Sequence, residues 1–169
     1  MKNLVLIGFM GVGKTTLGKK AAKRLGYEFI DMDKAIEMAE NRSIAEIFAQ
    51  KGEAYFRERE QQIAQDLSRL NHIVVATGGG VVKSPPAMKA LAQNAVVVWL
   101  QASAEVIYRH TLGDDSRPLL EGENRLDRIR LLLEEREPLY RQFAQKTVVA
   151  EGPMKNTVSR IVTAWEEEQ

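Results

Sequence analysis

Residues 8–15 constrain the fold of this chain more than any other segment. They read Gly-Phe-Met-Gly-Val-Gly-Lys-Thr and match the pattern G-x-x-x-x-G-K-[ST] at every fixed position. An apolar run, residues 4–7, precedes the motif and predicts a buried strand, and a helix-forming stretch, residues 14–25, follows it. The glycines let successive N–H groups face one anion, and the start of the helix adds its positive dipole end. The motif therefore predicts a nucleoside-triphosphate site. The alternative, a glycine-rich turn that binds nothing, does not account for its place between a strand and a helix.

The rest of the chain alternates short apolar runs with helical stretches. Further strands are predicted at residues 27–30, 73–77, 95–100 and 147–150. Ser43 and Ser103 fit helix N-caps, Gly52 is a predicted helix stop, and Pro138 is expected to kink or restart a helix. This alternation indicates an α/β fold around a parallel sheet, and 169 residues suit a single domain spanning residues 1–169.

Composition removes several classes of function. Lys plus Arg is 24 and Asp plus Glu is 23, a balance that does not favour binding to nucleic acid or to a charged membrane surface. The chain has no Cys, which excludes disulfides, thiolate metal sites and Cys nucleophiles. The longest uncharged stretch, residues 90–104, is shorter than the roughly 20 residues of a membrane-spanning helix. No secretory cleavage site follows the apolar N-terminal run, so we expect a soluble cytoplasmic protein.

Two residues of the motif carry the chemistry of phosphate binding. Lys14 supplies a positive charge to the β- and γ-phosphates, and the Thr15 hydroxyl is a ligand for Mg²⁺. The N-K-x-D motif that most GTPases use to recognise their base is absent from the sequence. A short chain that combines a phosphate loop, a second substrate region and a polar segment at residues 113–124 indicates a small-molecule kinase.

Five further motifs lie along the chain in a fixed order. They are Asp31-Met32-Asp33, Phe56-Arg57-x-x-Glu60, Thr77-Gly78-Gly79-Gly80, Arg117-Pro118-Leu119-Leu120 and Arg136-x-Pro138-Leu139-Tyr140. Together with the phosphate loop, this set resembles the shikimate kinase family over essentially the whole chain.

The resemblance implies a three-layer α/β phosphate-loop kinase with a five-stranded parallel sheet flanked by helices. It also implies a small substrate-binding insertion at residues 34–70 and a mobile lid at residues 112–124. The implied reaction transfers the γ-phosphoryl group of ATP to the 3-hydroxyl of shikimate. The implied partners are the small molecules ATP and shikimate, the implied cofactor is Mg²⁺, and the implied state is a monomer.

The resemblance also assigns roles to individual residues. The ATP-binding set is Gly11, Val12, Gly13, Lys14, Thr15, Thr16, Arg109, His110 and Arg117, of which Lys14 and Arg117 are also catalytic. Mg²⁺ is assigned to Thr15 and, through water, to Asp31, and Asp33 is the candidate base or positioner of the acceptor hydroxyls. The acceptor site is assigned to Asp33, Arg57, Gly79, Gly80 and Arg136, with Phe48, Phe56 and Glu60 as its wall. A planar guanidinium matches a carboxylate bidentately, which suits the two arginines to clamp the acid group of shikimate.

Each assignment competes with a plainer structural role. Asp31 and Asp33 lie two residues apart on a predicted extended segment, so both can face the ligand, but Asp is also a preferred N-cap for a helix that begins near residue 34. Arg57 is spaced to pair with Glu53 or Glu60, a contact that is compatible with orienting it for substrate. For Arg136 the alternative is a local salt bridge to a nearby Glu, for Arg117 a solvated loop position. The residue that stacks on adenine, Arg109 or His110, stays open.

Two other functions are consistent with parts of the pattern. A different small-metabolite kinase of the same fold, such as a gluconate kinase, shares the phosphate loop but not the combination of Arg57, Arg136 and Gly79. A non-catalytic nucleotide-binding regulator predicts ATP binding without turnover. The presence of Lys14, Asp33 and Arg117 speaks against that second alternative.

Overall fold

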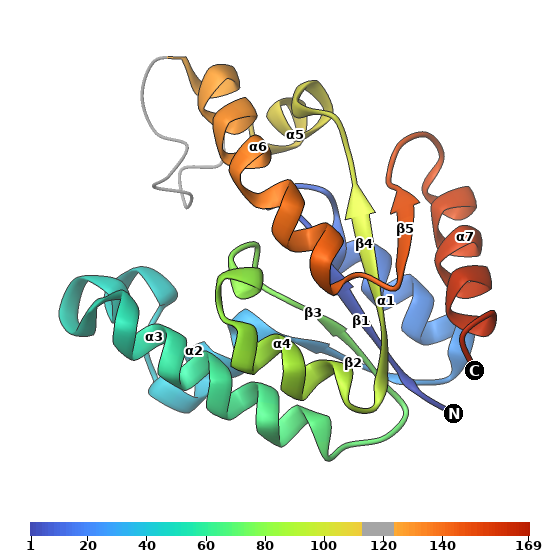
Figure 1. Ribbon diagram of the computed structural model, residues 1–169, viewed down its shortest axis with the longest axis horizontal. Coiled ribbons are helices and arrows are strands. Elements are labelled where there is room, and N and C mark those ends of the chain that lie inside the picture. Colours follow the sequence, from blue (N-terminus) through green and yellow to red (C-terminus); the bar gives the residue numbers. More distant parts are fainter. Residues whose placement is uncertain (113–123) are drawn as a thin grey trace.

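The structure is a computed structural model that describes residues 1–112 and 124–169 (Figure 1). Its strands are β1 (Asn3–Ile7), β2 (Glu28–Asp31), β3 (Ile73–Ala76), β4 (Ala95–Gln101) and β5 (Lys146–Val149). Its helices are α1 (Lys14–Leu25), α2 (Met32–Glu40), α3 (Ile44–Ser68), α4 (Pro85–Ala92), α5 (Ala104–Thr111), α6 (Arg125–Phe143) and α7 (Met154–Glu166), with a 3₁₀ turn η1 (Val81–Lys83).

The strands form one sheet in the order β2-β3-β1-β4-β5, and every neighbouring pair is parallel. Parallel neighbours require crossover helices, which cover both faces of the sheet and explain why the three central strands, β3, β1 and β4, are almost continuously apolar. All carboxyl ends of the strands meet at one edge, so the loops after β1, β2 and β3 lie side by side there.

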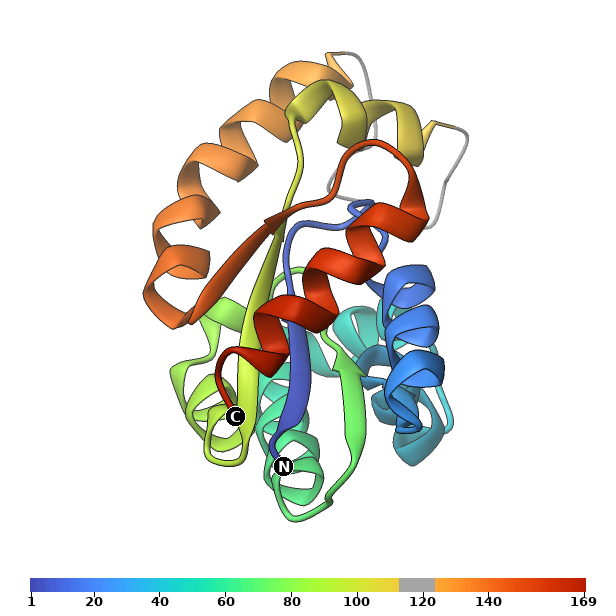
Figure 2. The ribbon, with the colours of Figure 1, turned by 90° about the vertical axis from the view of Figure 1, so that its right-hand side faces the viewer.

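Two hydrophobic clusters fill the space on the two sides of the sheet. Along β1, Leu4 and Leu6 belong to the first cluster, whereas Val5 and Ile7 belong to the second, as the two-residue period of a strand requires. The first cluster is completed mainly by α1 and α7, and the second mainly by α2, α3 and α4 (Figures 1 and 2). The predicted three-layer α/β fold with a five-stranded parallel sheet is confirmed.

Local signals placed most helix boundaries correctly. The hydroxyls of Ser43 and Ser103 accept hydrogen bonds from Glu46 N and Val106 N, and so cap α3 and α5 as predicted. Gly52 has φ 86° and ψ 170°, which are not helical values, so α3 consists of two helical stretches that meet there and the predicted helix stop is confirmed. At Pro138 no new helix begins, since α6 continues to Phe143.

The segment predicted as a substrate-binding insertion, residues 34–70, contains most of α2 and all of α3, which connect β2 to β3. Its role stays a prediction. The lid predicted at residues 112–124 falls almost entirely on residues 113–123, outside the described residues. Among the helices that the structure describes, none is long and apolar enough to cross a membrane.

Candidate active site

The phosphate loop joins β1 to α1 at the carboxyl edge of the sheet. Gly11 and Gly13 have φ values of 83° and 99°, a left-handed conformation that glycine adopts without a Cβ penalty. The Lys14 ammonium folds back over the loop and donates hydrogen bonds to Gly8 O at 2.5 Å and Phe9 O at 3.0 Å. No side chain caps the N-terminus of α1, so its first N–H groups point outward as anion donors.

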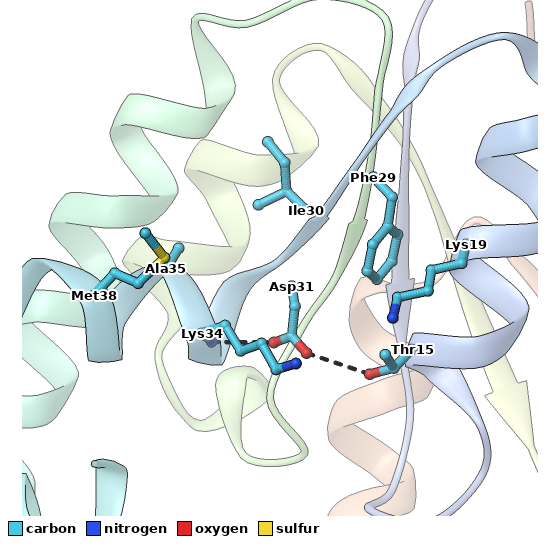
Figure 3. A pocket seen from close by; sticks show the side chains of 8 residues that line it. All are labelled: Thr15, Lys19, Phe29, Ile30, Asp31, Lys34, Ala35 and Met38. Atoms are coloured by element: carbon cyan, nitrogen blue, oxygen red, sulfur yellow. Dashed lines mark hydrogen bonds between the residues drawn. The ribbon is translucent and has the colours of Figure 1, made fainter. Parts of the chain in front are cut away.

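Thr15 faces the end of β2 across the loop (Figure 3). Its hydroxyl donates a 3.4 Å hydrogen bond to Asp31 Oδ2, while Asp31 Oδ1 accepts from Lys34 N at 3.2 Å and caps α2. Asp31 therefore has the capping role considered for it, while its other carboxylate oxygen meets Thr15; its role toward Mg²⁺ stays a prediction. The pair lines a hollow of about 300 Å³ together with side chains of α1, β2 and α2.

Asp33 lies in the first turn of α2 and not on an extended segment. The prediction that Asp31 and Asp33 project together from extended chain is wrong, because capping by Asp31 starts the helix at Met32. The Asp33 carboxylate instead reaches back to Gly78, where an added Cβ would stand 2.6 Å from Asp33 Oδ1. The pKa of Asp33 is raised, first by burial and then by the charge of Asp31, while Lys14 opposes the shift.

Arg57 lies on α3 with its guanidinium against Gly80. A Cβ on Gly80 would come within 2.8 Å of Arg57 Nη2, so only glycine permits this approach. Arg57 Nη1 donates to both carboxylate oxygens of Glu60 at 3.0 and 3.2 Å, and Nη2 lies 3.4 Å from Glu53. Burial raises the pKa of Glu60, and the cation of Arg57 lowers it in part. Both pairings considered from the sequence are present, and they leave Arg57 at the glycine loop.

Arg136 reaches the same loop from α6. It is 3% exposed, its Nη1 donates to Gly79 O at 3.4 Å, and its guanidinium lies 5.4 Å from the centre of the Phe9 ring. The local salt bridge considered for Arg136 does not form: no carboxylate of the described residues lies within ion-pair distance, and Nε has no hydrogen-bond partner there. A buried cation without a counter-charge is costly, which marks this position as a site for an anion.

Two phenylalanines of α3 form a pair of rings, one of which contacts Arg57. The rings of Phe48 and Phe56 are 4.8 Å apart, and the guanidinium of Arg57 lies 5.2 Å from the centre of the Phe56 ring. Phe56 is buried in the second cluster, whereas Phe48 is 37% exposed. Phe48 thus presents a partly exposed ring beside Phe56, and its role as a wall of the acceptor site stays a prediction.

The remaining ATP-site residues are less closely gathered. Val12 is buried, and Thr16 and Arg109 are exposed. His110 Nδ1 lies 2.8 Å from Gly11 O, which brings the end of α5 against the phosphate loop. Arg117 lies outside the described residues.

Tyr140 belongs to the last of the five motifs, but no role was predicted for it. Its side chain is fully buried, and its hydroxyl donates a 2.6 Å hydrogen bond to Gly79 O. Tyr140 is four residues after Arg136, a spacing that places both side chains on one face of α6. From that spacing, contact of both side chains with the same segment, here the carbonyl of Gly79, was predictable.

Known proteins resemble this chain over nearly its full length. A family model described as Shikimate kinase matches residues 10–166. The chain is 47% identical over 166 residues to a shikimate kinase of Caldanaerobacter subterraneus subsp. tengcongensis, and the match covers 98% of this chain and 96% of the relative. The structure resembles a shikimate kinase from Acinetobacter baumannii in complex with shikimate, with a TM-score of 0.93 and 36% identity over 100% of this chain and 95% of that one. A gluconokinase from Sinorhizobium meliloti 1021, with a TM-score of 0.65 and 17% identity over 99% and 93% of the two chains, shares the fold alone.

Proposed function

The chain belongs to the shikimate kinase family and is an ATP-dependent kinase that phosphorylates the 3-hydroxyl of shikimate, and we propose that the residues gathered at the glycine loop are its acceptor site. One observation carries this assignment: Arg136 is buried without a carboxylate partner among the described residues. The monoanionic carboxylate of shikimate supplies the missing charge. Arg57, held by Glu60 at the neighbouring glycine, completes the clamp.

Asp33 is proposed to act on the hydroxyl that receives the phosphoryl group. Its carboxylate lies at Gly78, on the same loop that meets the two arginines, so clamping the acid group of the acceptor directs a ring hydroxyl toward Asp33. Burial makes this carboxylate a stronger base than an exposed Asp, since its raised pKa brings it closer to neutrality. Asp33 then accepts the hydroxyl proton as the oxygen attacks the γ-phosphorus.

Lys14 and the first N–H groups of α1 are proposed to bind the phosphates. In phosphoryl transfer the protein contributes mainly position and charge stabilisation, since the transferred group carries its charge on its outer oxygens. The Lys14 ammonium already lies inside the loop, held by two of its carbonyl groups. It supplies a fixed positive charge to the β- and γ-phosphates without a large rearrangement.

The residues present fit Mg²⁺. Thr15 and Asp31 offer two hard oxygen donors close together at the start of α1, and Mg²⁺ commonly takes one or two protein oxygens with phosphates and water as its other ligands. No group of three or more acidic or imidazole side chains that could hold a metal occurs among the described residues, which agrees with such a sparse protein contribution. When bound, the ion neutralises charge on the β- and γ-phosphates.

Other assignments stay proposals from the sequence. Arg117 is proposed to stabilise charge on the transferring phosphoryl group, and Arg109 or His110 to lie against adenine. His110 already contacts the carbonyl of Gly11, which makes the neighbouring Arg109 the freer of the two for stacking. A cytoplasmic monomer and a substrate-binding role for residues 34–70 are proposed with them.

The test is an assay of ADP release in which shikimate and gluconate are compared as acceptors at saturating MgATP. We expect ADP release that depends on shikimate, with little stimulation by gluconate. Preference for gluconate would overturn the acceptor assignment. ATP binding without any acceptor-dependent turnover would favour the regulator instead.

A further inference from the structure

Tyr140 is buried below the glycine loop, in contact with both the core and the acceptor site. Its ring stacks on Trp99 with centroids 5.7 Å apart and an interplanar angle of 25°, and it belongs to the second hydrophobic cluster. Its hydroxyl leaves that apolar setting to donate to Gly79 O at 2.6 Å, a short hydrogen bond. Packing thus fixes the ring, and the hydrogen bond from its hydroxyl restrains the carbonyl group of Gly79.

The loop needs such an external constraint. Gly78, Gly79 and Gly80 have no side chains with which to define their own conformation, and glycine loses more backbone freedom on ordering than any other residue. Gly79 also packs closely on the phosphate loop, since an added Cβ would lie 3.2 Å from Met10 N. Small rotations of this peptide therefore change the acceptor site and its distance from the phosphates together.

A trans peptide has its C=O and the following N–H on opposite sides. Because Tyr140 and Arg136 both donate to Gly79 O, the N–H of Gly80 points to the other side of the peptide. No described residue accepts a hydrogen bond from the N–H of Gly79 or Gly80. These two donors lie beside the two arginines and remain available to an anionic ligand.

We propose that Tyr140 is a positioning residue for acceptor binding: it fixes the Gly79–Gly80 peptide so that the Gly80 N–H is directed at the carboxylate of the acceptor. The inference rests on the proposed assignment of Arg57, Arg136 and the glycine loop as the acceptor site. Tyr140 does not touch the acceptor. It sets the direction of a donor that does.

The hydroxyl keeps its proton through the working range of the enzyme. Burial raises the pKa of Tyr140 to about 12, although the nearby Arg136 cation acts in the opposite sense. Tyr140 therefore donates to Gly79 at every pH at which the protein is assayed, and its loss changes affinity without adding a new ionisation.

The test compares Tyr140→Phe with Tyr27→Phe, which removes a hydroxyl at the other end of the sheet. Tyr27 precedes β2, whereas Gly79 follows β3, and its ring contacts His72 and Trp165. For Tyr140→Phe we expect the KM for shikimate to rise about tenfold, as for one lost orienting hydrogen bond, with kcat and the KM for ATP within about twofold. Tyr27→Phe should leave all three values unchanged.

A second readout follows the peptide itself. With ¹⁵N-glycine labelling, the protein gives amide signals from 12 glycines only. In the parent protein, shikimate should shift the Gly80 amide strongly, and in Tyr140→Phe this shift should shrink, while glycines remote from the loop stay in place.

Three outcomes overturn the inference: an unchanged KM for shikimate in Tyr140→Phe, an equal rise in both KM values, or an undiminished shift of the Gly80 amide. A lower melting temperature with unchanged shikimate KM would identify Tyr140 as a packing residue alone. Arg136→Lys, measured in parallel, shows whether only the inference about Tyr140 fails or whether the assignment of the acceptor site fails with it. If it also binds shikimate normally, the acceptor site itself is wrongly assigned.

Discussion

Replacing Arg136 by methionine tests the acceptor site most directly. The methionine keeps an apolar stem beside Phe9 and removes only the charge and its donors. Since Arg136 is 3% exposed, a ligand oxygen bonded to it is also removed from water. Truncating one partner of such a buried charged contact costs about 2–5 kcal/mol, and a central value of about 3 kcal/mol corresponds to roughly a 10²-fold loss of affinity.

The loss is measurable without turnover. At a shikimate concentration of about 100 Kd, the parent protein gains about 2.7 kcal/mol of stability, whereas a variant bound about 10²-fold more weakly gains only about 0.4 kcal/mol. For a chain of this size those values correspond to melting-temperature shifts of about 5–10 °C and about 1 °C. Calorimetry then gives the two dissociation constants directly.

The stability of the variant without shikimate is a second, independent test. Arg136→Met removes a buried cation that has no carboxylate partner among the described residues, so without shikimate the variant should be at least as stable as the parent. Arg141→Met removes an exposed cation of the same helix, which lies 5.8 Å from the centre of the Trp99 ring; it is the charge control and should leave the shikimate affinity unchanged. An unchanged dissociation constant in Arg136→Met, or marked destabilisation of the ligand-free protein, would refute the reasoning.

Four other substitutions probe the remaining parts of the site. Lys14→Met should abolish shikimate-dependent ADP release while the circular dichroism spectrum stays that of the parent; near-normal turnover would disprove the phosphate-loop assignment. Asp33→Asn should reduce kcat by about 10²-fold or more. The folded-state pKa of Asp33 is raised, so burying its charge costs stability at neutral pH. Asp33→Asn should therefore have a higher melting temperature than the parent at pH 7. The difference in melting temperature should shrink as the pH falls through the raised pKa. In Gly80→Ala the new methyl group displaces Arg57, so the KM for shikimate should rise while the KM for ATP does not. Arg117→Ala should lower kcat far more than either KM, and a rise in the shikimate KM alone would make Arg117 a binding residue.

The sequence was sufficient for most features that neighbouring residues determine. The phosphate-loop pattern predicted both β1 and α1, because its glycines and the helix start are contiguous in the chain. The caps at Ser43 and Ser103 were predictable for the same reason, since a side chain there bonds to an N–H three residues on. The strand order β2-β3-β1-β4-β5, by contrast, was not predicted, because no residue pattern specifies which buried strand lies next to which.

Contacts between distant segments could not be read in this way. Tyr140 and Gly79 are 61 residues apart, and their hydrogen bond exists because α6 packs against the segment that follows β3. The contact of Asp33 with Gly78 also joins segments that are far apart in the sequence. Asp33 was also misplaced by a local competition: the capping of α2 by Asp31 started the helix two residues before the position expected from the sequence. Residue types were therefore predicted more reliably than the directions in which they point.

Charge pairing around the glycine loop gives a physical reason for the proposed selection of an acid by this site. Glu60 balances Arg57, and Asp33 lies within the field of Lys14, which lowers the pKa that burial raises. Arg136 has no carboxylate of the described residues within ion-pair distance, so its own positive charge is unpaired at the loop. A neutral polyol brings hydroxyls but no charge and leaves Arg136 buried and uncompensated, whereas a monoanionic acceptor removes that cost on binding. The site thus discriminates against neutral acceptors, because a neutral ligand leaves the charge of Arg136 buried without a counter-charge.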